Sequence, residues 1–256
     1  MAGRIRVFGH YADRVLVLLP PSETKADGGS GAPLDLDTLS FGELNPVRRK
    51  LVDNVVELAA DVPACRVALG LTERQDAEIE RNAGLWHAPT VAALHRYTGV
   101  LYDNLDARTL TRAETHRAYA RLAVVSALFG VVRATDPIPA YRLSGGSGLP
   151  GVGPLGALWR PVLEPVLGAL DELVVDLRSG PYAALAKLPN AVTVRVVTAT
   201  GTSVSHFNKA AKGRLARALV TARTEPSSVT GLLRIARNAG SRLVRAGDGA
   251  LELITE

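Results

Sequence analysis

Short apolar runs recur along the chain and predict the strands of a buried sheet. Residues 15–19 (VLVLL) stop at two prolines, residues 124–132 (VVSALFGVV) are almost entirely apolar, and residues 174–177 and 192–197 are rich in β-branched side chains. Runs this short, bounded by proline or turn residues, favour strands, and continuous apolarity favours strands covered on both faces. The pattern therefore predicts an α/β protein in which helices cover a sheet.

Capping patterns and helical periodicity occupy the intervals. Asn45, Thr72, Thr90 and Thr111 are expected to cap helices, and a Gln or Glu three residues after Thr72 and Thr111 completes a capping box. The predicted helices span residues 45–59, 64–69, 72–82, 90–96, 111–122, 154–170 and 201–224. Residues 242–256 alternate around an Asp-Gly dipeptide, which is typical of a hairpin that closes a sheet. Residues 1–14 precede the first strand as an extension, with an added edge strand expected at 5–8.

Polar side chains follow three of the predicted strands. Ser22, Glu23, Thr24 and Lys25 place two hydroxyls, a carboxylate and an ammonium within four residues. The segments 133–142 and 176–182 add arginine, aspartate and tyrosine side chains after the second and third strands. Strand ends in a helix-covered sheet are common ligand sites, although polar loops also occur there by default.

Composition narrows the classes of protein. The 256 residues are 47% hydrophobic and 21% charged, which is typical of one compact globular domain. Aromatic residues make up only 5%, which argues against a protein that stacks single-stranded bases on rows of rings. Cys65 is the only cysteine and is interpreted as a buried apolar residue. With no signal-peptide pattern and no apolar stretch of membrane-spanning length, the sequence predicts a cytoplasmic protein without membrane contact.

The net charge of +5 is concentrated in one segment. Residues 201–224 contain five basic side chains and no acidic one, and their apolar positions share one helical face. Such a helix is either a solvated surface or a binding face for phosphate groups. Two short helical pieces that meet at Gly70 form either a plain surface pair or a helix-hairpin-helix element, whose turn amides can hold a phosphate.

Five segments together resemble the peroxide stress protein YaaA family. They are VLVLLPPSETK at 15–25, YTGVLY at 97–102, SALFGVVRATDPIPAYRLS at 126–144, VVDLRSGPY at 174–182 and VSHFNKAAKGRLAR at 204–217. The resemblance runs from about residue 15 to the end. It implies a single α/β domain over 15–256 with a mixed sheet, a positively charged cleft, a helix-hairpin-helix element, and DNA binding linked to protection from hydrogen peroxide and free iron.

By the same resemblance, residues of four segments would line that cleft. They are Ser22, Glu23, Thr24, Lys25, Tyr97, Thr98, Tyr141, Arg142, Lys209 and Lys212. The chain departs from the family pattern at Gly145 and Gly146, where many members have Met-Gly, and in its 14-residue extension. Both departures are compatible with a relative that acts on a different substrate.

The first functional hypothesis is a nucleic-acid-binding stress protein. In it Lys209, Lys212, Arg214 and Arg217 contact phosphates, and the turn amides near Gly70 add a further contact.

The alternative is an enzyme of a specialised metabolic pathway that acts on a nucleoside-like or phosphorylated small molecule. Glu23 would be the general acid or base, Lys25 or Lys209 an electrophilic or nucleophilic amine, and Tyr97 and Arg142 anchors. A scaffold protein without chemistry is a third possibility. None of these hypotheses includes a metal or cofactor, because the five histidines are scattered and none is spaced from another as metal ligands are.

Overall fold

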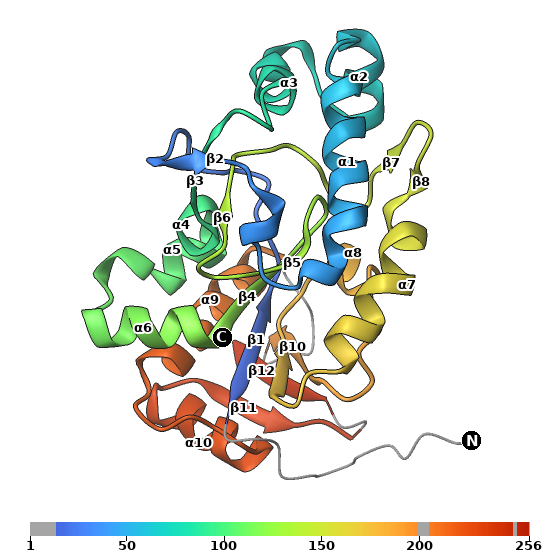
Figure 1. The fold of residues 1–256 in the computed structure, drawn as a ribbon. Helices are drawn as coiled ribbons and strands as arrows, with labels where there is room; N and C mark the ends of the chain where they lie inside the picture. The colour runs from blue at the N-terminus through green and yellow to red at the C-terminus, as the bar shows by residue number, and fades with distance from the viewer. Residues whose placement is uncertain (1–13, 199–204, 248–249, 256) are drawn as a thin grey trace.

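The computed structural model describes residues 14–198, 205–247 and 250–255, with the backbone alone at 205–207. The expected edge strand at 5–8, the first residues of the basic helix and the turn at 248–249 lie outside the described residues. Helices surround a seven-stranded mixed sheet, which confirms the α/β class (Figure 1).

The sheet has a parallel centre and an antiparallel hairpin at each edge. Its strand order is β11-β12-β10-β9-β1-β4-β5, with all pairs from β12 to β4 parallel. The strands span β1 Val15–Leu19, β4 Leu122–Ser126, β5 Gly130–Arg133, β9 Leu173–Asp176, β10 Val192–Thr198, β11 Arg242–Arg245 and β12 Leu251–Thr255. Every residue of β1, β4 and β9 is buried, as their continuous apolarity predicts.

The sequence-based expectation of one strand at 124–132 is wrong. The run folds back on itself as β4 and β5, an antiparallel pair in which Ser126 lies opposite Gly130. The Ser126 hydroxyl accepts hydrogen bonds from the backbone N–H groups of Leu128 and Phe129, and Gly130 has φ of 72°, so the chain reverses within a few residues. A Cβ at Gly130 would stand 2.7 Å from the Trp159 ring, so the turn also requires the missing side chain. Apolarity alone did not reveal the turn, because both strands and the turn are buried.

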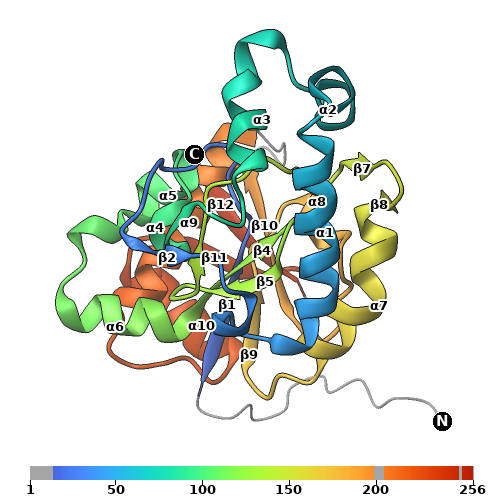
Figure 2. The ribbon, with the colours of Figure 1, turned by 45° about the horizontal axis from the view of Figure 1, so that its top comes forward.

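Helices cover both faces of the sheet (Figures 1 and 2). α1 and α7 lie on one side near β5, and α5, α6 and α9 lie on the other. The helices of four or more residues are α1 Asn45–Leu58, α2 Val62–Leu69, α3 Asp76–Ala83, α4 Ala93–Arg96, α5 Val100–Leu105, α6 Arg112–Arg121, α7 Leu155–Gly168, α8 Gly180–Ala183, α9 Ser205–Thr221 and α10 Val229–Asn238. Helix α10 was not predicted from the sequence, although the Ser228 side chain caps it.

Two of the four predicted caps are wrong. Asn45 is already the first residue of α1 and follows a 3₁₀ turn at Gly42–Leu44, so its side chain binds Asp37 and Arg48 instead. Thr90 lies in a strand, β3 Pro89–Ala92, where pairing with β2 (Gly31–Pro33) and β6 (Pro137–Ile138) overrides its capping tendency.

The other two caps form as capping boxes. The N–H of Thr72 donates to the side chain of Gln75 at 3.1 Å, and the N–H of Thr111 to that of Glu114 at 2.8 Å. The Thr72 box begins a 3₁₀ turn at Glu73–Gln75 that leads directly into α3, which ends at Ala83 beside Gly84. The Thr111 box begins α6, which ends at Arg121. Local hydrogen bonds between a cap and the third residue decide these helix starts, so sequence spacing was sufficient.

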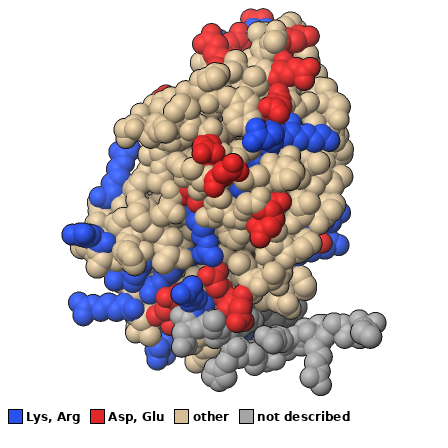
Figure 3. Space-filling model, viewed as in Figure 1, with Lys and Arg blue, Asp and Glu red and all other residues tan. Residues whose placement is uncertain are grey.

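The α2–α3 hairpin turns at Gly70, which has φ of 63°. Two turn amides are already bonded within the hairpin: the N–H of Leu71 donates to Arg66 O at 2.8 Å and that of Thr72 to Gln75. The Arg66 guanidinium pairs with Asp76 and Glu73. On the face shown in Figure 3, acidic side chains gather at this end of the molecule, whereas most basic ones lie along the side formed by α5, α6 and α10.

The order of the strands defines a switch point between β1 and β9. From β1 the chain reaches β4 on one side, whereas β9 occupies the other side of β1 and is followed outward by β10 and β12. The loops that leave β1 and β9 therefore diverge at the carboxyl edge of the sheet and leave room between them. Ligands of open α/β sheets bind at such a crevice.

None of the helices in the described part of the chain is long and apolar enough to cross a membrane.

Candidate functional site

A cavity of about 690 Å³ opens at this switch point. Its walls come from five segments: the loop after β1, the start of α5 with the residues before it, the loop after β6 at Ser144, the loop after β9 with α8, and the first turns of α9. The polar residues that line it are Ser22, Glu23, Thr24, Thr98, Tyr102, Ser144, Arg178, Ser179, Tyr182, Asn208, Lys209 and Lys212. The first and third polar strand ends of the sequence analysis thus meet in one cavity, because β1 and β9 are adjacent and parallel.

The second polar strand end does not meet the other two directly. Because β5 runs back towards the amino edge of the sheet, Arg133 lies opposite Ala123 and binds Glu172. Asp136 accepts hydrogen bonds from Ser40 and from the N–H of Arg133. Only the end of this segment, at Tyr141 and Arg142, returns to the region of the cavity.

Three hydroxyls form a cluster on one wall. Thr98 donates to Thr24 at 3.1 Å, the Ser22 and Thr24 hydroxyls lie 3.2 Å apart, and the N–H of Thr24 donates to the Ser22 hydroxyl. Pro20 and Pro21 end β1 and begin this loop, because neither can donate to the ladder. Gly99 has φ of 92°, and a Cβ there would stand 3.4 Å from the Ser22 hydroxyl and 3.5 Å from the Thr24 hydroxyl, so the Tyr97–Gly99 loop runs close to this cluster.

Lys25 lies beneath this loop and does not line the cavity. Its ammonium donates to the carbonyls of Ser22 at 3.0 Å and Glu23 at 3.4 Å, and stands 4.1 Å from the centre of the Tyr141 ring. Burial lowers the pKa of Lys25 from 10.5 to about 7, and nearby Glu23 opposes part of that effect. Lys25 therefore supports the loop that carries Ser22, Glu23 and Thr24.

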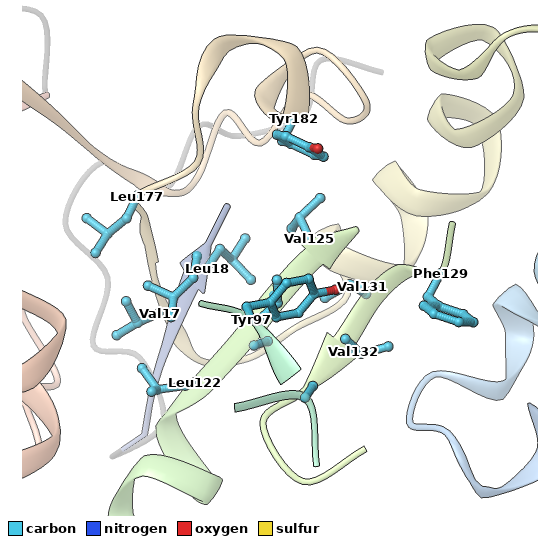
Figure 4. Close-up of a cluster of buried hydrophobic side chains, with 14 of the residues drawn as sticks. Val17, Leu18, Tyr97, Leu122, Val125, Phe129, Val131, Val132, Leu177 and Tyr182 are labelled. Atoms are coloured by element: carbon cyan, nitrogen blue, oxygen red, sulfur yellow. The ribbon is translucent and has the colours of Figure 1, made fainter. Parts of the chain in front are cut away.

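Tyr97 and Tyr141 form the layer below. Their hydroxyls lie 2.9 Å apart, and Tyr141 lies 2.7 Å from the Ser126 hydroxyl. Because the two N–H groups of the β4–β5 turn occupy the lone pairs of Ser126, its proton goes to Tyr141, and the Tyr141 proton goes to Tyr97. Burial raises the pKa of both phenols above the ordinary value. Figure 4 shows Tyr97 among the valines of β4 and β5, with Tyr182 apart on the side of α8.

Glu23 is fixed at the cavity by an ion pair. Its carboxylate lies 3.0 Å from Arg142, and its side chain remains 48% exposed. Asn82 of α3 holds the Arg142 backbone with two hydrogen bonds of 2.8 Å, one from its amide to the Arg142 carbonyl and one to its carbonyl oxygen from the Arg142 N–H. The sequence analysis did not single out Asn82, because its contact with residue 142 arises only in the fold.

The opposite wall contains a second ion pair. Arg178 binds Asp176 through two side-chain hydrogen bonds of 2.9 and 2.7 Å, and both groups are almost fully buried. Lys212 of α9 donates to the Arg178 carbonyl at 2.9 Å. Burial lowers the pKa of Lys212, and Asp176 opposes this. Asp176 therefore neutralises Arg178, and within the described residues Lys212 has no counter-ion of its own.

Helix α9 is held close to α5 at Gly213. A Cβ there would stand 2.2 Å from the Leu101 carbonyl oxygen, so only glycine allows this contact. The approach places Lys209 and Lys212 at the cavity. Arg214 instead donates to Asn104 at 3.2 Å, and Arg217 donates to the carbonyls of Leu105 and Asp106 at 2.8 Å.

The structure thus separates the predicted site residues into groups. Ser22, Glu23, Thr24, Thr98, Lys209 and Lys212 line the cavity; Lys25, Tyr97 and Tyr141 lie below it, Arg142 pairs with Glu23, and Arg214 lies along α5. Tyr102 and Ser144 also line the cavity, and the sequence analysis assigned neither of them a role. In the described ranges, no three His, Cys, Asp or Glu side chains gather as metal ligands would. Cys65 is buried.

Comparison with known proteins places these features in a family. The family model described as peroxide stress protein YaaA matches residues 15–239. A UPF0246 protein of Corynebacterium efficiens is 48% identical over 94% of this chain and 99% of its own length. A UPF0246 protein of Streptomyces coelicolor is 46% identical over 88% of this chain and 90% of its own, and an uncharacterized protein of Campylobacter jejuni is 27% identical over 78% and 82%. The chain belongs to the peroxide stress protein YaaA family.

Proposed function

We propose that the cavity between β1 and β9 binds a small anionic molecule, nucleotide-like or phosphorylated, and that the protein acts on it as an enzyme. The observation that carries this proposal is the cavity itself. About 690 Å³ is within the range of small-molecule sites, and it lies at the switch point where open α/β sheets bind ligands. A nucleic-acid duplex is too wide to enter a space of this size.

The charges that face the cavity support an anionic ligand. Glu23 and Arg178 each have a partner of opposite charge, Arg142 and Asp176. Lys209 and Lys212 form no ion pair within the described residues. An anion that enters would therefore meet two ammonium groups that no carboxylate of the described residues pairs with.

Glu23 is the group best placed for chemistry. It lines the cavity, is partly exposed, and is held by Arg142 on one side, which leaves its remaining lone pairs for a ligand. A carboxylate in this position serves as general acid or base. Lys25, predicted as a catalytic amine, contributes through the loop that it supports, because its ammonium donates to the carbonyls of that loop.

Binding is tested by thermal-shift and calorimetric titration with nucleotides, sugar phosphates and dicarboxylates. Lys209→Met is expected to weaken binding at least tenfold, and Arg223→Met, which removes an exposed charge from the turn that follows α9, is expected to leave it unchanged. Equal loss in both variants would point to a general charge effect and contradict the cavity as the site.

Turnover is tested by incubating the wild-type protein with a metabolite extract and measuring depleted compounds by mass spectrometry. Glu23→Gln is expected to abolish depletion while the affinity for the depleted compound stays within about tenfold. Depletion at the wild-type rate by Glu23→Gln would remove the acid or base role.

A second candidate function is nucleic-acid binding, which one observation favours. Helix α9 has no acidic residue, and Arg214, which does not line the cavity, is exposed on it. The helix could contact phosphates at the surface while the cavity remains a separate site. Log affinity for a DNA duplex is then expected to fall linearly with log salt concentration, and Arg214→Met to reduce the slope by about one. A flat response between low and physiological salt would eliminate this candidate.

A further inference from the structure

We propose that the cavity is selective for a phosphate monoester, whose dianionic group binds between Lys209 and Lys212 of α9 and the hydroxyl cluster of Ser22, Thr24 and Thr98. This inference rests on the proposed small-anion site and narrows it to one class of ligand.

The charge count favours a ligand with two negative charges. Four charged side chains line the cavity: Glu23, Arg178, Lys209 and Lys212. Glu23 is compensated by Arg142 and Arg178 by Asp176, so the surplus is two positive charges. A phosphate monoester carries a charge near −2 at neutral pH, whereas a diester or a single carboxylate carries −1.

The spacing of the two lysines fits one phosphate group. Residues 209 and 212 are three apart in α9, so they share a helix face with their Cβ atoms about 5–6 Å apart. The contact at Gly213 fixes this face against α5. Lys212 uses one of its three N–H groups on the Arg178 carbonyl, and Lys209 has no protein partner in the described ranges, so N–H donors from both are available.

The hydroxyl cluster supplies a donor from another wall. Three hydroxyls carry three protons, but only two hydrogen bonds join them. Whichever of Ser22 and Thr24 donates to the other, one of their two O–H groups makes no hydrogen bond within the cluster and can donate to a ligand. One neutral hydroxyl donor together with two cations suits a tetrahedral group with three oxygens better than a planar carboxylate.

The half-buried position of Lys212 also favours an anionic ligand. Asp176, Arg178, Lys209, Tyr102, Tyr182 and Glu23 are the charged or titratable groups on the elements around its end of the cavity. Only Asp176 raises its pKa, and that carboxylate is engaged by Arg178. A bound dianion would supply a counter-charge to this half-buried ammonium, which forms no ion pair within the described residues.

The affinity test uses five probes with the full chain: AMP, ribose 5-phosphate, cyclic AMP, adenosine and malate. Calorimetry at pH 7.5 is expected to show AMP or ribose 5-phosphate binding at least tenfold more tightly than cyclic AMP, with adenosine weaker still. Cyclic AMP or a dicarboxylate such as malate binding as tightly as both monoesters would overturn the phosphate-monoester inference but leave the small-anion site intact. No binding of any anion would refute the proposed site itself.

The charge test follows the phosphorus resonance of the bound monoester between pH 5 and 8. If the two lysines bind the dianion about ten times more tightly than the monoanion, the second pKa of the phosphate is about one unit lower in the complex than in free solution, because binding and proton release are linked. An unchanged phosphate pKa in the complex would contradict the proposed contacts.

The variants separate binding from folding. Lys209→Met and Thr98→Val are each expected to weaken the tighter monoester at least tenfold and to reduce its advantage over cyclic AMP. Arg223→Met is the matched control, and it should retain both the affinity for the monoester and the preference for it over cyclic AMP. Lys209 and Thr98 lie on the cavity wall, and an unchanged unfolding temperature of Lys209→Met and Thr98→Val would show that both variants keep the fold. If both variants still preferred the monoester, the inference would be refuted.

Discussion

Lys25 is a lysine whose neutral form the fold favours. Its ammonium is packed against Tyr141 and under the loop of Ser22 and Glu23, and burial brings its pKa to about 7. In the unfolded chain the same group keeps its proton to about pH 10.5. Between these values the unfolded state binds more protons, so the free energy of unfolding rises with pH.

Lys25→Met is therefore expected to reduce the rise in stability between pH 7 and 10. One such group contributes at most about 1.4 kcal/mol per pH unit to the slope of the free energy of unfolding against pH. The variant should keep part of the slope, because the lowered pKa of Lys212 acts in the same direction. Urea unfolding at several pH values measures this. Lys50→Met removes an exposed ammonium and should preserve the wild-type slope. A Lys25→Met slope equal to that of the wild type would show that the fold does not desolvate Lys25.

Ser126 is the residue on which the β4–β5 turn and the tyrosine pair both depend. Its hydroxyl accepts from Leu128 and Phe129 and donates to Tyr141, and it is fully buried. Ser126→Ala leaves two buried N–H groups without an acceptor and is expected to cost about 2–4 kcal/mol of stability, since each orphaned group costs about 1–3 kcal/mol.

Denaturant unfolding of Ser126→Ala beside Tyr141→Phe separates the two roles. Tyr141→Phe leaves the turn acceptor in place and is expected to cost less. A larger loss of stability in Tyr141→Phe than in Ser126→Ala would mean that the tyrosine pair, and not the turn, depends on Ser126.

At the scale of elements, the α5–α9 contact positions the lysines of the cavity. Gly213→Ala would place a methyl group 2.2 Å from the Leu101 carbonyl oxygen and 2.8 Å from the Asn104 Cβ. The helices must separate, and we expect a loss of about 1–3 kcal/mol together with weaker anion binding. Gly168→Ala in α7 meets no atom within 4 Å and should be neutral or slightly stabilising, which makes it the control. Equal thermal unfolding temperatures for the two variants would contradict the close contact.

The end of α9 is held by α6. Arg117 donates to the carbonyls of Val220 and Thr221, and Arg121 to those of Leu219 and Ala222. These cations satisfy the carbonyls that a helix leaves free at its carboxyl end and suit its dipole. Both arginines therefore fix the far end of the helix whose first turns line the cavity.

At the scale of the whole molecule, stability is expected to decrease from the centre of the sheet to its edges. β1 is buried along its whole length and paired on both sides, whereas β11 is an edge strand with two exposed arginines, and β7 (Gly148–Leu149) and β8 (Gly153–Pro154) form a separate small hairpin. Hydrogen exchange measured by mass spectrometry should be slowest in β1 and β9 and faster in β11 and β7–β8. Protection of β11 equal to that of β1 would contradict this.

Local patterns were sufficient for much of the secondary structure. The buried strands β1 and β9, the half-buried strand β10, the capping boxes at Thr72 and Thr111, and the β11–β12 hairpin follow from apolarity and short-range hydrogen bonds. Local patterns did not reveal the turn inside 124–132, because an apolar run has the same composition whether it is one strand or two. The strand at Thr90 was missed because distant pairing partners create it.

The sequence by itself determined that polar groups follow the buried strands, and the family motifs indicated which of those groups belong together. Only the tertiary structure decided the roles of neighbours such as Thr24 and Lys25, of which one lines the cavity and the other lies beneath it. Successive residues of an extended segment point to opposite sides, so adjacency in sequence does not imply a shared environment. The neutralising partners of Glu23 and Arg178, and hence the surplus charge of the cavity, likewise depend on which strands are adjacent and on long-range contacts.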